Sequence, residues 1–130
     1  MPWVEVFAVF VVCHLVGDYL FQSDWQAAHK MGGLGFDPVA RRALLTHTAA
    51  YAIAFVPAFV WLADYLGGGV LLVAALVAGP HLAQDDGRLL DLYLRRVKRC
   101  DPKSVPGVRA AVDQAFHVLA LFAVAIVVGG

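Results

Sequence analysis

Histidine and aspartate residues recur four positions apart within the apolar stretches of this 130-residue chain. Four-residue spacing places both side chains of a pair on one face of an α-helix. A further apolar stretch contains a single histidine, His47. Because titratable groups are costly inside apolar helices, their presence normally marks a functional site. Two pairs have the order His-x-x-x-Asp and a third has the reverse order: His14 with Asp18, His81 with Asp85, and Asp113 with His117.

Imidazole and carboxylate groups in one cluster are typical ligands of divalent metal ions. Four ligands satisfy a tetrahedral ion, so a larger set means either that two ions bind or that some aspartates orient the histidines. Zinc is the first candidate, with iron and manganese as alternatives, and we expect one or two ions. A carboxylate beside a metal can also act as a general base, so Asp18, Asp85 and Asp113 are the candidate catalytic groups. The predicted metal ligands are His14, Asp18, His47, His81, Asp85, Asp113 and His117.

The composition indicates that these residues lie in membrane helices. Hydrophobic residues make up 61% of the chain and charged residues only 15%, whereas a soluble domain is about 45–50% apolar. The apolar residues are concentrated in four long runs, and a membrane helix needs about 20 residues. We predict a single all-α membrane domain over residues 1–130. It is a polytopic four-helix bundle with helices over about 2–28, 38–66, 70–99 and 106–129.

The basic residues are confined to two segments, because all ten lysines and arginines lie within residues 30–42 and 88–109. The positive-inside rule places these segments in the cytosol and both termini outside. In this topology each His of the three pairs lies toward the outside and each Asp toward the cytosol, since the reversed pair is on a helix that runs the opposite way. The first and third helices share the His-x-x-x-Asp spacing, which predicts two hairpins related by a pseudo-two-fold axis.

Three further polar residues are predicted on the cytosolic side of the cluster and are candidates for binding a substrate: Gln22, Lys30 and Arg88. Gln22 lies one helical turn beyond Asp18 on the same face. Lys30 and Arg88 are suited to receive an anionic group as a point charge or a fork. The alternative is that these two cations only anchor the chain at the membrane surface.

Several polar motifs follow one another along the chain: His14-Leu-Val-Gly-Asp18-Tyr-Leu-Phe-Gln22, Lys30, His47, His81-x-x-x-Asp85 and Asp113-Gln114-x-x-His117. With these motifs the chain resembles a family of small bacterial four-helix integral membrane proteins that are grouped as a domain of unknown function. The resemblance covers nearly the whole chain and implies a multi-pass protein of the bacterial inner (plasma) membrane. A looser similarity links it to membrane-bound proteins labelled metal-dependent hydrolases. One departure is Asp86, where an apolar residue is expected, and we predict that it loosens the cytosolic end of the third helix.

We predict an integral membrane protein with an intramembrane His/Asp metal site that hydrolyses a phosphoester or lipid-like substrate. Its partners are the lipid bilayer and an amphiphilic or phosphate-bearing small molecule. Two alternatives remain open at this stage: a metal-ion or proton transporter or channel subunit, and a non-catalytic protein with a structural metal or polar network. Transport through four helices requires a homo-oligomer. No nucleic-acid partner is expected, because the topology explains the basic loops.

Overall fold

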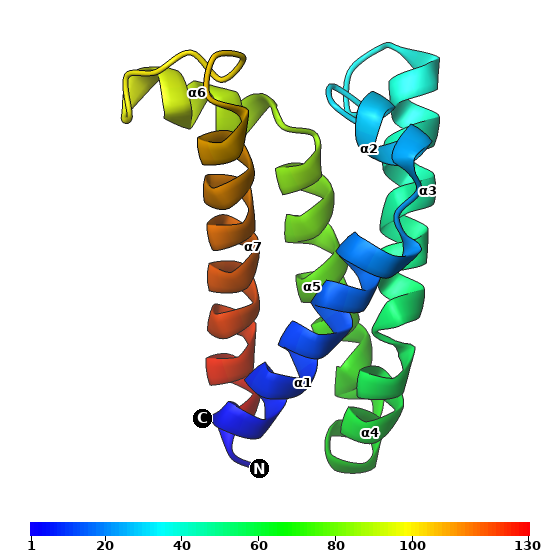
Figure 1. Ribbon diagram of the computed structural model, residues 1–130. Coiled ribbons are helices and arrows are strands. Elements are labelled where there is room, and N and C mark those ends of the chain that lie inside the picture. The colour runs from blue at the N-terminus through cyan, green and yellow to red at the C-terminus, as the bar shows by residue number, and fades with distance from the viewer.

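The protein is entirely helical. The computed structural model describes all 130 residues and contains no β-strand (Figure 1). The elements in chain order are α1 (Trp3–Leu15), the π-helical segment η1 (Val16–Phe21), α2 (Asp24–His29), α3 (Pro38–Ala54), α4 (Val56–Leu66), the 3₁₀ turn η2 (Gly67–Gly69), α5 (Val70–Asp85), α6 (Arg88–Arg96) and α7 (Pro106–Gly129).

Three helical stretches are long and apolar enough to cross a membrane, namely Trp3–Phe21, Val56–Asp85 and Pro106–Gly129. The second stretch is not one straight rod, because η2 reverses the chain and α5 returns alongside α4 (Figure 1). Large apolar side chains are exposed on the outer faces, among them Leu71 and Val127. An apolar surface of this extent indicates a membrane protein.

The first helix is shorter than the range 2–28 predicted from the sequence. The α-helix ends at Leu15 and continues as η1, after which Gln22 adopts an extended conformation with φ −69° and ψ 126°. A separate helix then begins because Ser23 and Gln26 form a capping box, in which each side chain accepts the other residue's backbone N–H. This Ser-x-x-Gln pattern is a known helix-start signal. The break turns α2 away from the direction of α1.

The other predicted helices are also interrupted, with one exception. The range 38–66 is divided at Phe55, two residues before Pro57. Proline has no backbone N–H to donate and therefore interrupts the helical hydrogen bonds. The range 70–99 is divided at Gly87, which has a φ of +80° that favours glycine. Helical structure also ends there at Arg96 rather than at residue 99. In contrast, α7 runs over Pro106–Gly129, the range expected of the last helix.

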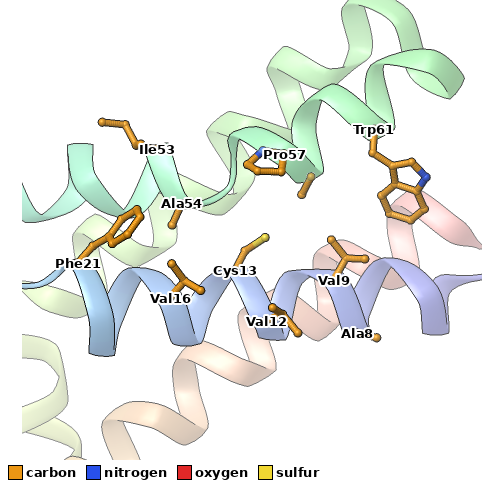
Figure 2. A pocket seen from close by; sticks show the side chains of 11 residues that line it. Ala8, Val9, Val12, Cys13, Val16, Phe21, Ile53, Ala54, Pro57 and Trp61 are labelled. Atoms are coloured by element: carbon orange, nitrogen blue, oxygen red, sulfur yellow. The ribbon is translucent and has the colours of Figure 1, made fainter.

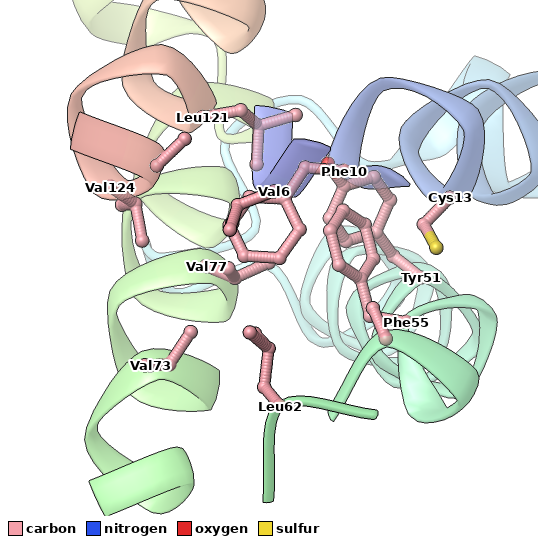
Figure 3. Packing of buried hydrophobic residues seen from close by; sticks show 12 residues of the cluster. Val6, Phe10, Cys13, Tyr51, Phe55, Leu62, Val73, Val77, Leu121 and Val124 are labelled. Atoms are coloured by element: carbon pink, nitrogen blue, oxygen red, sulfur yellow. The ribbon is translucent and has the colours of Figure 1, made fainter. Parts of the chain in front are cut away.

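The long elements pack in a ring around one interior. Helix α1 contacts α7, α7 contacts α5, α5 contacts α3, and α3 closes the ring against η1. The interior nearer the chain termini is filled by an apolar core that includes Phe10, Tyr51, Phe55, Leu62 and Leu121 (Figure 3). The buried histidines and aspartates lie directly beyond this core, where His14 meets the hydroxyl of Tyr51.

The two ends of the molecule differ in charge. Both termini lie at one end, whereas α2 and α6 lie at the other (Figure 1). All ten lysines and arginines belong to segments at the end that holds α2 and α6. The folded chain therefore separates its basic residues from its termini.

Asp86 fastens the loop after α2 to the junction between α5 and α6. Its carboxylate accepts the backbone N–H of Leu34 at 2.9 Å and the Nε–H of Arg88 at 2.7 Å. Its backbone carbonyl accepts the N–H of Gly32 at 2.8 Å. The prediction that Asp86 loosens this end of the helix is therefore wrong, because these bonds tie two segments together.

We expect Asp86→Ala to lower the free energy of unfolding by about 1–3 kcal/mol, since the variant leaves the Leu34 N–H without its acceptor. Burial alone would raise the pKa of Asp86, but the bonds from Arg88 and Leu34 outweigh it and hold that pKa below its usual value. The contribution of the ionised Asp86 to the free energy of unfolding is therefore fully present above the unfolded pKa of about 3.9. It is lost as the pH falls through the lower folded pKa.

Thermal unfolding in detergent, followed by circular dichroism between pH 7 and pH 3, measures both effects. The wild type should lose stability on acidification more steeply than Asp86→Ala. Asp64→Ala, at an exposed position, is the control and should change the free energy of unfolding by less than about 0.5 kcal/mol. Equal acid dependence in wild type and Asp86→Ala contradicts the assignment.

Candidate metal centre

The predicted ligands come together inside the ring of helices. His14 is the second-last residue of α1, and Asp18 lies on η1. His47 lies on α3, His81 and Asp85 lie on α5, and Asp113 and His117 lie on α7. All are buried except Asp113, whose side chain is 22% exposed. The histidines of the three His/Asp pairs, all expected toward the outside, lie next to one another. The ring centre of His117 is 5.6 Å from that of His14 and 4.8 Å from that of His81.

Four of these side chains direct single atoms at a common point. The Nε2 atoms of His47 and His81 are 3.0 Å apart, and each is 2.7 Å from Oδ2 of Asp85. Oδ1 of Asp18 is 3.2 Å from Nε2 of His47 and 3.7 Å from Nε2 of His81. Ligand atoms bound to tetrahedral zinc at about 2.0–2.1 Å are about 3.4 Å from one another. The observed separations bracket this value, so this four-ligand group could hold a metal ion.

Hydrogen bonds alone do not satisfy the four-ligand group. Oδ1 of Asp18 and Oδ2 of Asp85 are buried and have no hydrogen-bond partner. If both facing imidazole nitrogens carry a hydrogen, the two hydrogens crowd the same oxygen. If one nitrogen lacks it, a lone pair faces a carboxylate oxygen at 2.7 Å. A cation between the four atoms removes both conflicts, and two imidazoles with two carboxylates suit a divalent metal.

Tyr51 fixes the orientation of His81. The two rings stack with their centres 3.5 Å apart and an angle of 10° between their planes. Gly17 on η1 makes room for this tyrosine, because a Cβ at that position would lie 2.6 Å from Cδ2 of Tyr51. Sequence reasoning missed Tyr51, although it lies four residues after His47 and therefore on the same helix face.

His14 lies outside the four-ligand group and orients Asp18. Both of its ring nitrogens are engaged, Nδ1 with the Tyr51 hydroxyl at 2.9 Å and Nε2 with Oε1 of Gln114 at 2.8 Å. Since an amide oxygen only accepts, Nε2 of His14 donates, and Nδ1 accepts the hydroxyl hydrogen of Tyr51. The amide nitrogen of Gln114 then donates to Oδ2 of Asp18 at 3.3 Å. The sequence motif contains Gln114, but its role appears only in the structure.

The three candidate substrate residues separate into two groups. Nζ of Lys30 is 3.2 Å from Oδ2 of Asp85 and donates to Oε1 of Gln22 at 2.7 Å, so Lys30 contacts the four-ligand group and Gln22 holds Lys30 there. Lys30 therefore does more than anchor the chain at the membrane surface. Arg88 instead pairs with Asp86 and is 55% exposed. Its predicted place beside the cluster is not observed, because α6 turns away at Gly87.

Comparison with known proteins supports one assignment. Residues 6–129 match the family described as "Protein of unknown function (DUF3307)". The chain belongs to this family. The match includes every residue of the two groups of possible metal ligands. No curated protein matches the chain, and no solved structure matches it. The looser similarity to metal-dependent hydrolases is thus not supported by any match.

A second group of possible ligands in this DUF3307 protein adjoins the first. It consists of Asp85, Asp113 and His117, each of which offers one ligand atom within 4.8 Å of the others. Nε2 of His117 is 3.1 Å from Oδ1 of Asp85, and its Nδ1 is 3.6 Å from Oδ1 of Asp113. Asp85 belongs to both groups. Its Oδ2 faces the four-ligand group and its Oδ1 faces His117 of the second group.

A large hollow on the surface of the DUF3307 protein lies elsewhere. It has a volume of about 810 Å³ and lies between α1–η1 and α3–α4, where Val12, Pro57 and Trp61 line it (Figure 2). No ligand of either metal group faces it. Its almost entirely apolar lining offers no chemistry, so the metal cluster remains the candidate site.

Proposed function

We propose that this DUF3307 protein is a membrane-embedded metal-dependent hydrolase that acts on an amphiphilic phosphoester. The observation that carries the proposal is the convergence of four buried ligand atoms, with the ammonium group of Lys30 at the same carboxylate. Zinc is the proposed metal, since the donor set and the near-tetrahedral separations suit it. Such a metal lowers the pKa of a bound water and polarises a phosphoryl oxygen.

We place the protein in the bacterial inner membrane with four passes, formed by α1–η1, α3–α4, α5 and α7. The basic end that holds α2 and α6 would face the cytosol and both termini the outside, following the positive-inside rule. The two hairpins would be related by a pseudo-two-fold axis, because α1 lies opposite α5 and α3 lies opposite α7 in the ring. Substrate would then approach from the cytosolic leaflet, the side from which Lys30 reaches the cluster.

The side chains of the site have distinct tasks in this proposal. His47, His81 and Asp85 form the tighter contacts with one another and would hold the metal. Oδ1 of Asp18 lies farther from the two histidine nitrogens, at 3.2 and 3.7 Å, so we assign to it the role of a general base that would take up a proton from water. Lys30, held by Gln22, binds an anionic oxygen of the substrate.

Transport is less well supported than hydrolysis. Phe10 and Phe55 are fully buried, and their ring centres are 5.7 Å apart. Together with Tyr51 they fill the interior between the cluster and the end that holds the termini (Figure 3). A polar path through one chain would have to pass this aromatic layer, which favours a site open to one side only.

The test compares wild type with Lys30→Met, both purified in detergent and loaded with zinc. We expect the wild type to release phosphate from a short-chain phosphatidic acid. Lys30→Met should keep its metal but show a KM raised at least about tenfold, the factor that a contact of about 1.4 kcal/mol represents.

Lys98→Met, at an exposed position of the same basic end, is the matched control and should behave as wild type. A wild type that binds metal yet hydrolyses neither phosphomonoesters nor phosphodiesters overturns the proposed reaction. A wild type that retains no metal overturns the site itself.

A further inference from the structure

His117 has a buried nitrogen whose environment no hydrogen bond explains. Its Nδ1–H donates to the backbone carbonyl of Asp113 at 2.7 Å, which leaves a lone pair on Nε2 of the neutral ring. Nε2 is 3.1 Å from Oδ1 of Asp85, yet the two atoms do not meet the geometry of a hydrogen bond, and Nε2 has no other partner. The histidine is only 2% exposed, so this nitrogen is shielded from bulk solvent.

An Nδ1–H bound to a backbone carbonyl is the usual arrangement of a histidine that binds metal through Nε2. The atom that faces this Nε2 is the second oxygen of Asp85, whose Oδ2 already belongs to the four-ligand group. Asp113 extends from the same turn of α7 and completes a group of three possible ligands. A carboxylate with one oxygen in each group is positioned to bridge two ions, which lie about 3.5–4 Å apart in dinuclear sites.

We propose that His117, Asp113 and Oδ1 of Asp85 form a second metal position, with Asp85 bridging two ions. This inference rests on the proposed function and deepens it. The first position has four buried protein ligands, whereas the second has three. Three protein ligands leave a coordination place for water or substrate, as in catalytic sites. The second ion would therefore offer substrate an open coordination place, next to the shared Asp85 that Lys30 contacts.

A cavity opens beside Asp113, one of the three ligands of the second position, and no ligand of the first position lines it. It has a volume of about 210 Å³ and lies between α5, α6 and α7, where Asp113 lines it together with Leu89, Leu90, Tyr93 and Phe116. Asp113 is also the only partly exposed member of the cluster's carboxylates. The cavity combines the Asp113 carboxylate and the Gln84 side chain with otherwise apolar walls, which matches a ligand that has a polar head and an apolar body.

The charge of the cluster favours two ions over one for an anionic substrate. Counted in their ionised forms, three carboxylates oppose the single ammonium of Lys30, which leaves two negative charges. One divalent ion neutralises the site. A second divalent ion makes it positive, and only then does the site attract a phosphate group.

Metal stoichiometry tests the second position. The detergent-purified full chain is loaded with Mn²⁺, desalted and measured by elemental analysis and electron paramagnetic resonance. We expect two ions per wild-type chain with an exchange-coupled signal. Asp113→Asn and His117→Gln should each keep one ion, with the signal of an isolated Mn²⁺. Asp91→Asn, a carboxylate of α6 that pairs with Arg109, should keep two.

The outcomes separate this inference from the proposed function. One ion in the wild type and in Asp113→Asn overturns the second position and leaves the hydrolase proposal standing. Two ions that neither variant reduces are bound elsewhere and overturn it as well. No bound ion in the wild type overturns the proposed function. His117→Gln provides the decisive comparison if Asp113→Asn does not fold.

Discussion

Asp85→Asn is expected to abolish stoichiometric metal binding and, with it, hydrolysis. The carboxylate of Asp85 lies within 2.7–3.2 Å of His47, His81, His117 and Lys30, so no other side chain contacts as much of the cluster. Removing its charge takes away the carboxylate that the two groups share and leaves the ammonium of Lys30 opposed near the histidines only by the more distant Asp18, which weakens the attraction for a cation. The affinity should fall by more than the roughly 10- to 100-fold seen for changes outside the ligand shell. Competition with a chromogenic chelator and elemental analysis measure the loss.

Asp64→Asn is the matched control for this experiment. It removes the same charge from an exposed position on α4 and should leave the metal content unchanged. Retention of full metal affinity by a folded Asp85→Asn protein contradicts the assignment of the four-ligand group. Circular dichroism and gel filtration establish whether the variant is folded.

Gly17→Ala is expected to destabilise the protein and to weaken metal binding together. Replacing a helical glycine by alanine normally stabilises by roughly 0.5–1 kcal/mol. Here the added Cβ would lie 2.6 Å from Cδ2 and 3.3 Å from Cα of Tyr51, so the ring and the backbone of α3 must both shift. Overpacking of this kind costs about 1–3 kcal/mol, which outweighs the gain. A displaced Tyr51 no longer holds His81 in its stack.

The measurements are thermal unfolding in detergent and metal affinity by chelator competition. Gly107→Ala is the control, since its Cβ meets nothing within 4 Å in the first turn of α7. That variant should be at least as stable as wild type and bind metal equally well. If Gly17→Ala binds metal with wild-type affinity, Tyr51 does not position the site in the way that the structure indicates.

Much of the site follows from local spacing in the sequence. The His-x-x-x-Asp pairs predict shared helix faces, and a polar face in an apolar helix must turn inward because lipid does not solvate it. This reasoning finds the buried cluster and its membrane setting. The same spacing rule, applied to His47, also points to Tyr51. It predicts which side chains face the interior, because that choice depends only on helix geometry and on the cost of exposing polar groups to lipid.

The tertiary structure decides what each inward-facing group contacts. His14 and His81 have the same local pattern, yet His14 binds Tyr51 and Gln114 while His81 joins the four-ligand group. Lys30 enters the site because the capping box at Ser23 redirects α2, and Arg88 leaves it because Gly87 redirects α6. The sequence alone thus determines that imidazoles and carboxylates gather inside the bundle. Their partners depend on helix breaks and on contacts between residues up to 100 positions apart, which no local period encodes.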